Sequence, residues 1–110
     1  MEVFEIKGPL FFGAAYKFKD AIKFIEKTPK VLIIRMSLVP IIDATGIKTI
    51  RDVHAETRKR GTKLILSEVK SDQVLKELKN ARLLFAIGKA NITATFQNAI
   101  KRSSQILEEK

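Results

Sequence analysis

Apolar residues along the chain form two kinds of pattern, short continuous runs and longer stretches with a helical period. The apolar run at residues 31–34 is rich in β-branched side chains, and it predicts a central strand covered on both faces. Residues 3–6 and 63–67 predict two more strands, and Ile92 lies in a short last one. Residues 10–12 predict a further strand, which we expect to pair with residues 3–6 as a hairpin after the Gly-Pro turn.

The longer stretches have apolar residues three or four positions apart, as on one face of a helix. A first helix is predicted over residues 14–27, and Thr28 followed by Pro29 ends it. A second helix begins at Asp43, which we expect to be its N-cap, and ends at Gly61. Its apolar face is formed by Ile47, Ile50, Val53 and Thr57.

The remaining segments continue this alternation. Ser71 is expected to open a third helix, residues 83–87 form a helix tail or a turn, and Thr93 can cap a final helix through Leu107. Strands that alternate with helices across short loops predict an α/β layered domain with a mostly parallel sheet. We expect about five strands, with an antiparallel N-terminal edge strand, and about four flanking helices.

Length and charge narrow the class of protein. The chain has 110 residues, which fits one domain over residues 1–110. Its 21 lysines and arginines exceed the 12 aspartates and glutamates, and the formal charge of +9 suggests nucleic acid, anionic lipid or acidic proteins as partners. The basic residues are dispersed, with one dense tract at residues 58–60. We therefore expect no specific nucleic-acid binding, and an acidic cytosolic protein stays open as a partner.

Residues that could carry catalysis are scarce. His54 is the only histidine, and the chain has no cysteine and no serine elbow motif to partner it, so a packed, hydrogen-bonded histidine is the better interpretation. No glycine-rich phosphate loop is present. Asp52 and Glu56 are four residues apart among basic residues, which is typical of a solvated helix face. The sequence therefore predicts no enzyme, no catalytic residue, no metal and no cofactor.

The most informative segment is the entry to the second helix, Asp43-Ala44-Thr45-Gly46. A loop leaving the carboxyl side of the sheet feeds this helix, whose free amides and positive dipole end suit an anion, a phosphorylated hydroxyl or an acidic side chain. Thr45 would display its hydroxyl there. The alternative is that Asp43 only caps the helix, while Thr45 and Gly46 permit a tight entry.

Several motifs together resemble one known family. They are Gly8-Pro9-Leu10-Phe11-Phe12-Gly13, residues 30–36, Val39-Pro40 followed by Asp43-Ala44-Thr45-Gly46, residues 58–67, and Ala81-Arg82-Leu83 with Ile87-Gly88. The combination closely resembles the STAS domain at the cytoplasmic C-terminus of SulP sulfate permeases. The resemblance covers nearly all of the chain.

The resemblance implies the STAS fold and a regulatory, protein-interaction domain that modulates anion transport or trafficking without catalysis. It implies a place on the cytoplasmic face of the inner (plasma) membrane, as part of a multi-pass transporter whose transmembrane domain is a partner; the isolated chain would be soluble. Asp43, Ala44, Thr45 and Gly46 would then form a regulatory loop that binds an anion or a partner. Weak binding of an anion or a nucleotide at this loop stays open.

Bacterial anti-sigma factor antagonists share this domain and supply the alternative function. In them the loop reads Asp, a small residue, then a phosphorylatable Ser before Gly, and Thr45 holds that position. A free-standing antagonist would be phosphorylated at Thr45. This sequence departs from that pattern in having Thr for Ser and a transporter-type segment at residues 8–12. Arg82 also stands where relatives often have Gly, so we expect slight strain in the turn there.

Overall fold

One parallel sheet organises the structure. The computed structural model describes residues 1–23 and 29–108. Four strands follow one another in the order β1-β2-β3-β4, and all three neighbouring pairs are parallel. They are β1 (Glu2–Lys7), β2 (Val31–Leu38), β3 (Lys63–Ser67) and β4 (Ile92–Thr93). The predicted α/β class and the mostly parallel sheet are confirmed.

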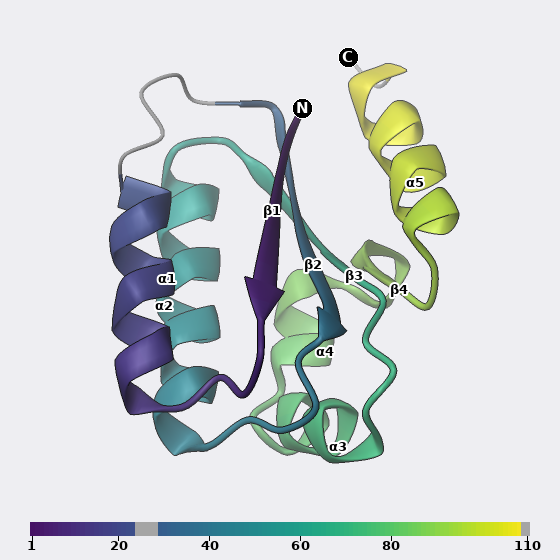
Figure 1. Ribbon diagram of the computed structural model, residues 1–110. Coiled ribbons are helices and arrows are strands. Elements are labelled where there is room, and N and C mark those ends of the chain that lie inside the picture. The colour runs from purple at the N-terminus through teal and green to yellow at the C-terminus, as the bar shows by residue number, and fades with distance from the viewer. Residues whose placement is uncertain (24–28, 109–110) are drawn as a thin grey trace.

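Helices cover both faces of this sheet. They are α1 (Phe12–Lys23), α2 (Ala44–Lys59), α3 (Asp72–Asn80), α4 (Leu83–Ile87), the short 3-10 helix η1 (Lys89–Asn91) and α5 (Phe96–Glu108). The first four α-helices share one core, and α5 covers the opposite face (Figure 1). Because successive crossovers use the same face, the strands succeed one another in chain order. The described residues thus contain five α-helices where about four were expected.

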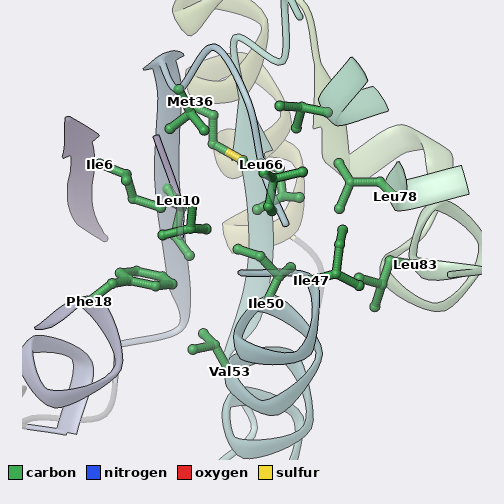
Figure 2. Packing of buried hydrophobic residues seen from close by; sticks show 14 of the residues in the cluster. Ile6, Leu10, Phe18, Met36, Ile47, Ile50, Val53, Leu66, Leu78 and Leu83 are labelled. Atoms are coloured by element: carbon green, nitrogen blue, oxygen red, sulfur yellow. The ribbon is translucent and has the colours of Figure 1, made fainter. Parts of the chain in front are cut away.

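The central strand β2 shows why one apolar run serves two layers. Successive side chains of a strand point to opposite faces. Leu32 and Ile34 therefore lie in the larger cluster with α1 to α4, whereas Val31 and Ile33 lie in the smaller cluster with α5. All four are at most 1% exposed, so the predicted two-sided burial is confirmed. Figure 2 shows part of the larger cluster, where side chains of α1, α2 and β3 gather in one interior.

The predicted N-terminal hairpin is wrong. β1 pairs with β2 in parallel, Leu10 makes only an isolated parallel bridge to Ile42, and α1 already begins at Phe12. Gly8, at φ 86°, redirects the chain after β1, and burial of the fully enclosed Leu10 in the larger cluster outweighs a return alongside β1. The described sheet therefore has no antiparallel edge strand, and it contains four strands where about five were expected.

Other local expectations have mixed outcomes. The last predicted residues of the first helix and its stop at Thr28 lie outside the described residues. Arg82 follows α3 in the left-handed region, at φ 61°, so the turn that favours Gly is confirmed. Thr93 does not cap the final helix, because it belongs to β4. Thr95 caps it instead, since its Oγ1 accepts a hydrogen bond from the amide three residues later at 3.0 Å.

Candidate functional site

The loop between β2 and α2, residues 39–43, lies at the carboxyl end of the sheet, where the turn into α1 also lies (Figure 1). The Leu10 amide donates to the Ile41 carbonyl oxygen at 3.0 Å, and the Asp43 amide donates to the Leu10 carbonyl oxygen at 3.5 Å. A parallel bridge joins Leu10 to Ile42. The stretch before α1 therefore holds one side of the loop.

Gln73 of α3 holds the other side of the loop. Its Oε1 accepts from the Ile42 amide and its Nε2 donates to the Ile42 carbonyl oxygen, both at 2.9 Å. Ser71, the N-cap of α3, donates its hydroxyl to the Pro40 carbonyl oxygen at 2.7 Å. One side-chain amide thus satisfies both backbone groups of one residue. The loop backbone is fixed from two directions, and no sequence pattern marks Gln73 for this role.

Asp43 caps α2, as predicted. Its Oδ1 accepts a hydrogen bond from the Gly46 amide at 2.8 Å, and its carbonyl oxygen accepts from the Ile47 amide at 3.0 Å. Within the described residues the amides of Ala44 and Thr45 make no hydrogen bond, as is usual in a first helical turn. Ala44 is exposed and Thr45 is half-buried. These two amides are therefore unpaired donors at the positive end of the helix dipole.

Thr45 carries the one hydroxyl among the four loop residues named from the sequence. Its carbonyl oxygen accepts from the Thr49 hydroxyl at 2.9 Å. Its own hydroxyl makes no hydrogen bond in the part of the chain that the structure describes. The structure therefore does not use this hydroxyl to hold the loop in place.

Gly46 is buried where α2 meets the Leu10 segment. A Cβ at this position would lie 2.5 Å from Ile42 Cγ1 and closer still to the Leu10 carbonyl oxygen. The backbone of α2 approaches the loop so closely that a side chain would have to displace one of them. Gly46 therefore permits the tight helix entry that the sequence suggested as one alternative. This role of Gly46 does not depend on the role of Thr45.

Acidic residues farther along α2 form ion pairs. Asp52 accepts hydrogen bonds from Lys48 and from Lys19 of α1, each at 3.1 Å. The Lys48 hydrogen bond, followed by that of Lys19, lowers the pKa of the Asp52 carboxyl, although partial burial opposes it. Glu56 pairs with Arg60 at 3.0 Å. These pairs match the expected solvated face, and Asp52 in addition ties α1 to α2.

A second charged cluster, at the ends of β2 and β3, was not predicted. Arg35 donates two hydrogen bonds to the Glu68 carboxylate, at 2.8 and 2.9 Å, and the Ser67 hydroxyl donates a third at 3.0 Å. The Arg35 guanidinium also lies over the Phe96 ring, 4.2 Å from its centroid. Glu68 itself is buried and has φ 63°, which costs a non-glycine residue energy. The bidentate pair holds the guanidinium that packs on Phe96, the first residue of α5.

His54 differs from the packed, hydrogen-bonded residue that was expected. It is half-buried, and its ring has no hydrogen-bond partner among the described residues. Burial, and then the charge of Arg58, lower its pKa. In the described ranges no three His, Asp or Glu side chains lie close enough together to hold a metal ion.

A comparison with protein families identifies the fold. The model of the STAS domain matches residues 2–99 of the chain. The chain belongs to the STAS domain family. The comparison with curated proteins finds no match. No helix in the described part of this STAS domain is both long and apolar enough to cross a membrane.

Solved structures resemble this STAS domain along nearly its whole length. The sulfate transporter family protein from Wolinella succinogenes is 38% identical with a TM-score of 0.91, covering 98% of this chain and 88% of that one. The STAS domain of a SulP transporter from Vibrio cholerae is 31% identical with a TM-score of 0.83, covering 99% and 84%. The resemblance to SulP-type STAS domains, noted from the sequence, is confirmed.

A longer protein shares the fold. Murine solute carrier 26 family member A9, an anion transporter in the inward-facing state, matches 94% of this chain with a TM-score of 0.82 at 18% identity. The STAS domain covers 17% of that transporter. At this identity the match shows only that the two proteins share the fold.

Replacing the cap residue tests the geometry of the loop. Asp43→Ala should lower the free energy of unfolding by about 1 kcal/mol, because the Gly46 amide loses its acceptor. Asp43→Asn should retain nearly all of the stability, since asparagine is an equally good N-cap. Urea unfolding measures both values. An equal loss in the two variants would show that the charge of Asp43, and not its capping geometry, matters.

Proposed function

We propose that this STAS domain is a regulatory, protein-interaction domain of a SulP-type sulfate or other inorganic-anion transporter, on the cytoplasmic face of the membrane. It carries no catalytic activity, and the transmembrane domain of the parent transporter is its first partner. The loop Asp43-Ala44-Thr45-Gly46 is its control site. The similarity to the STAS domain of the Vibrio cholerae SulP transporter, at 31% identity, supports the assignment.

One observation carries the control site: two unpaired amides on a loop whose backbone is fixed from both sides. Leu10 and Gln73 hold Ile42, and Asp43 caps the helix without occupying the amides of Ala44 and Thr45. A preformed pair of donors needs little reordering to bind a carboxylate, a phosphate or another anion. A partner's acidic side chain, a free anion or the phosphate of a nucleotide would meet the same donors.

Substitution of Thr45 by aspartate tests this proposal in the full-length transporter. A carboxylate in the first turn of α2 is favoured by the helix dipole, so the isolated domain should melt close to its normal temperature. The new charge competes with an anionic ligand for the amides. We therefore expect Thr45→Asp to change sulfate uptake, or the association of the domain with the transmembrane domain, by several-fold.

Thr45→Asn is the matched control, because it has a similar size but no charge. It should leave uptake close to the wild-type rate. Membrane insertion is checked by surface labelling of each variant. Unchanged uptake and unchanged interactions in a correctly inserted Thr45→Asp transporter would reduce the loop to a helix entry and refute the proposal.

The alternative function, a free-standing anti-sigma factor antagonist phosphorylated at Thr45, is favoured by one observation. The Thr45 hydroxyl has no hydrogen-bond partner within the described residues and is half-buried. The gene distinguishes the two functions. A reading frame that continues upstream into many hydrophobic segments supports the transporter, whereas a neighbouring gene for an anti-sigma factor supports the antagonist.

A further inference from the structure

A basic surface with a protruding aromatic ring surrounds α4, on the side of the domain where α4 packs beside α2. Phe85 of α4 is 89% exposed, the highest value among the described large hydrophobic side chains. Full exposure of a phenylalanine leaves a large apolar area in water. The ring contributes little to the packing of the described fold, so it is available to a binding partner that would cover it.

Two hollows flank Phe85. The larger, about 560 Å³, is lined by residues of α2 and α4, and its apolar lining residues include Ala55, Leu83 and Ala86. The smaller, about 470 Å³, is also lined by Phe85 and includes Leu84. Phe85 therefore borders two hollows whose accessible surface is mainly apolar.

The rims of both hollows are basic. Six lysines and arginines and no aspartate or glutamate are found among their described lining residues: Arg51, Arg58, Lys59, Lys79, Arg82 and Lys89. We call Phe85 with these six residues the α4 surface. Arg51 donates to the Ala81 carbonyl oxygen at 3.0 Å, and none of the other five takes part in the ion pairs of the described residues. Within the described residues these five side chains therefore have no carboxylate partner.

Arg82 gives independent support for a function. It lines both hollows, and its backbone is in the left-handed region, at φ 61°, where Gly is less strained. The turn uses this backbone, because the Arg82 amide donates to the Lys79 carbonyl oxygen and its carbonyl oxygen accepts from the Ala86 amide, both at 3.0 Å. A glycine would meet the same requirement with less strain, so the presence of an arginine is a reason to look for a function of its side chain. Arg82 and Phe85 are the two described residues that line both hollows.

Shape and charge together select the class of ligand. A flat bilayer surface would touch Phe85 and leave the two hollows unfilled, and nucleic acid would use the charges but not the alanine and leucine side chains that line the hollows. An amphipathic protein segment can place apolar side chains in a groove and polar ones on its rim. Carboxylates on that segment complement the unpaired basic rim.

We propose that the α4 surface docks an acidic amphipathic segment of a partner protein, with its apolar residues in the larger hollow. Phe85 is then covered at the centre of the contact, and Arg58, Lys59 and Arg82 face the carboxylates of the partner. Aromatic and arginine residues that become buried at the centre of an interface usually carry most of the binding energy. This site is separate from the Asp43–Gly46 loop and does not depend on it.

The probe is a designed helical peptide with leucines on one face and glutamates on the other, labelled with a fluorophore. A peptide of identical composition, with the leucines spread around the helix, is the matched probe. Anisotropy titration of the whole 110-residue chain should show at least tenfold tighter binding of the first peptide. Amide resonances of Phe85 and Ala86 should shift on binding.

Four variants identify the surface. Phe85→Ser and Arg58→Glu should each weaken binding about tenfold, and neither residue is buried or paired in the described fold. Leu107→Ser and Lys101→Glu make the same kinds of change on exposed residues of α5, on the opposite face, and should bind like the wild type.

Several outcomes would overturn the docking site: no binding, equal binding of both peptides, or equal affinity of all four variants. Phe85-dependent binding to phosphatidylglycerol vesicles or to a DNA duplex, without peptide binding, would assign the surface to membrane or nucleic acid instead. Shifts confined to Ala44 and Thr45 would refute the α4 surface and leave the proposed control loop standing.

Discussion

Gly46→Ala should lower the free energy of unfolding by about 2–3 kcal/mol, because the added methyl group overpacks a junction with no free space. The new Cβ would lie 2.5 Å from Ile42 Cγ1 and closer still to the Leu10 carbonyl oxygen. One of these atoms is backbone and is held in the bridge between Leu10 and Ile42, so α2 has to move. Urea unfolding of the purified domain measures the loss.

Gly13→Ala is the matched control within the same domain. Gly13 also lies in a helix, α1, but nothing comes within 4 Å of a Cβ placed there. Alanine should therefore leave the stability within about 1 kcal/mol of the wild type, with a gain expected from the reduced freedom of the unfolded chain. Similar losses in both variants would mean that the close approach at Gly46 is not the cause.

The helices and the central strand could be predicted because their signals are local. Apolar spacing marked α2 and α5, and the continuous run at residues 31–34 marked the strand buried on both faces. Asp43 and Ser71 were recognisable as N-caps because a cap uses an amide only three residues away. Such features depend on a few consecutive residues, which the sequence displays directly.

The prediction of an N-terminal hairpin was wrong because it rested on local evidence, whereas the strand pairing depends on residues far away in the sequence. A Gly-Pro turn between two apolar stretches is compatible with a hairpin and with a turn into a helix. The choice depends on β2, which pairs with β1 in parallel, and on Ile42, which bridges to Leu10. Neither partner can be recognised from residues 3–12 alone.

The hydrogen bonds by which Gln73 holds the candidate loop were missed for the same reason. Gln73 lies 31 residues from Ile42, and no pattern marks one glutamine among the polar residues of α3. The loop residues themselves could be selected from the helix entry and the STAS resemblance. That Asp43 caps the helix is confirmed, and that Thr45 and its neighbours bind a partner stays a prediction.

The Arg35–Glu68 pair could not be predicted either, and its removal should have the second largest effect on stability. Glu68→Gln should destabilise the domain by about 2 kcal/mol at neutral pH, because the amide keeps one acceptor for Arg35, places an NH2 group against the other donor and removes the negative charge from the pair. Arg35 is one-third exposed, so solvent compensates part of the loss. Glutamine has the same side-chain length as glutamate and meets the same backbone strain at φ 63°. The measured loss therefore reports on the charge and the second acceptor oxygen of the carboxylate.

The same pair sets a pH dependence with a definite sign. The hydrogen bond from Arg35, and then that from Ser67, lower the pKa of Glu68 in the folded domain. As the pH falls, Glu68 is protonated in the unfolded chain before it is protonated in the folded domain. The stabilisation by the Arg35–Glu68 pair is therefore complete above the ordinary glutamate pKa, and it is lost as the pH falls through the lowered pKa of the folded domain. The wild type should therefore lose stability in acid, and Glu68→Gln should lose less from the same starting pH.

Asp52→Asn is the matched comparison, because the pKa of the Asp52 carboxyl is also lowered in the folded domain. Asp52 is more exposed, at 32% against 9% for the Glu68 side chain, so solvent screens its two lysine contacts more strongly. Chemical denaturation at a series of pH values should give a clearly flatter acid profile for Glu68→Gln than for Asp52→Asn. If Glu68→Gln keeps the full acid sensitivity of the wild type, the bidentate pair does not stabilise the fold, and the left-handed backbone at Glu68 needs another explanation.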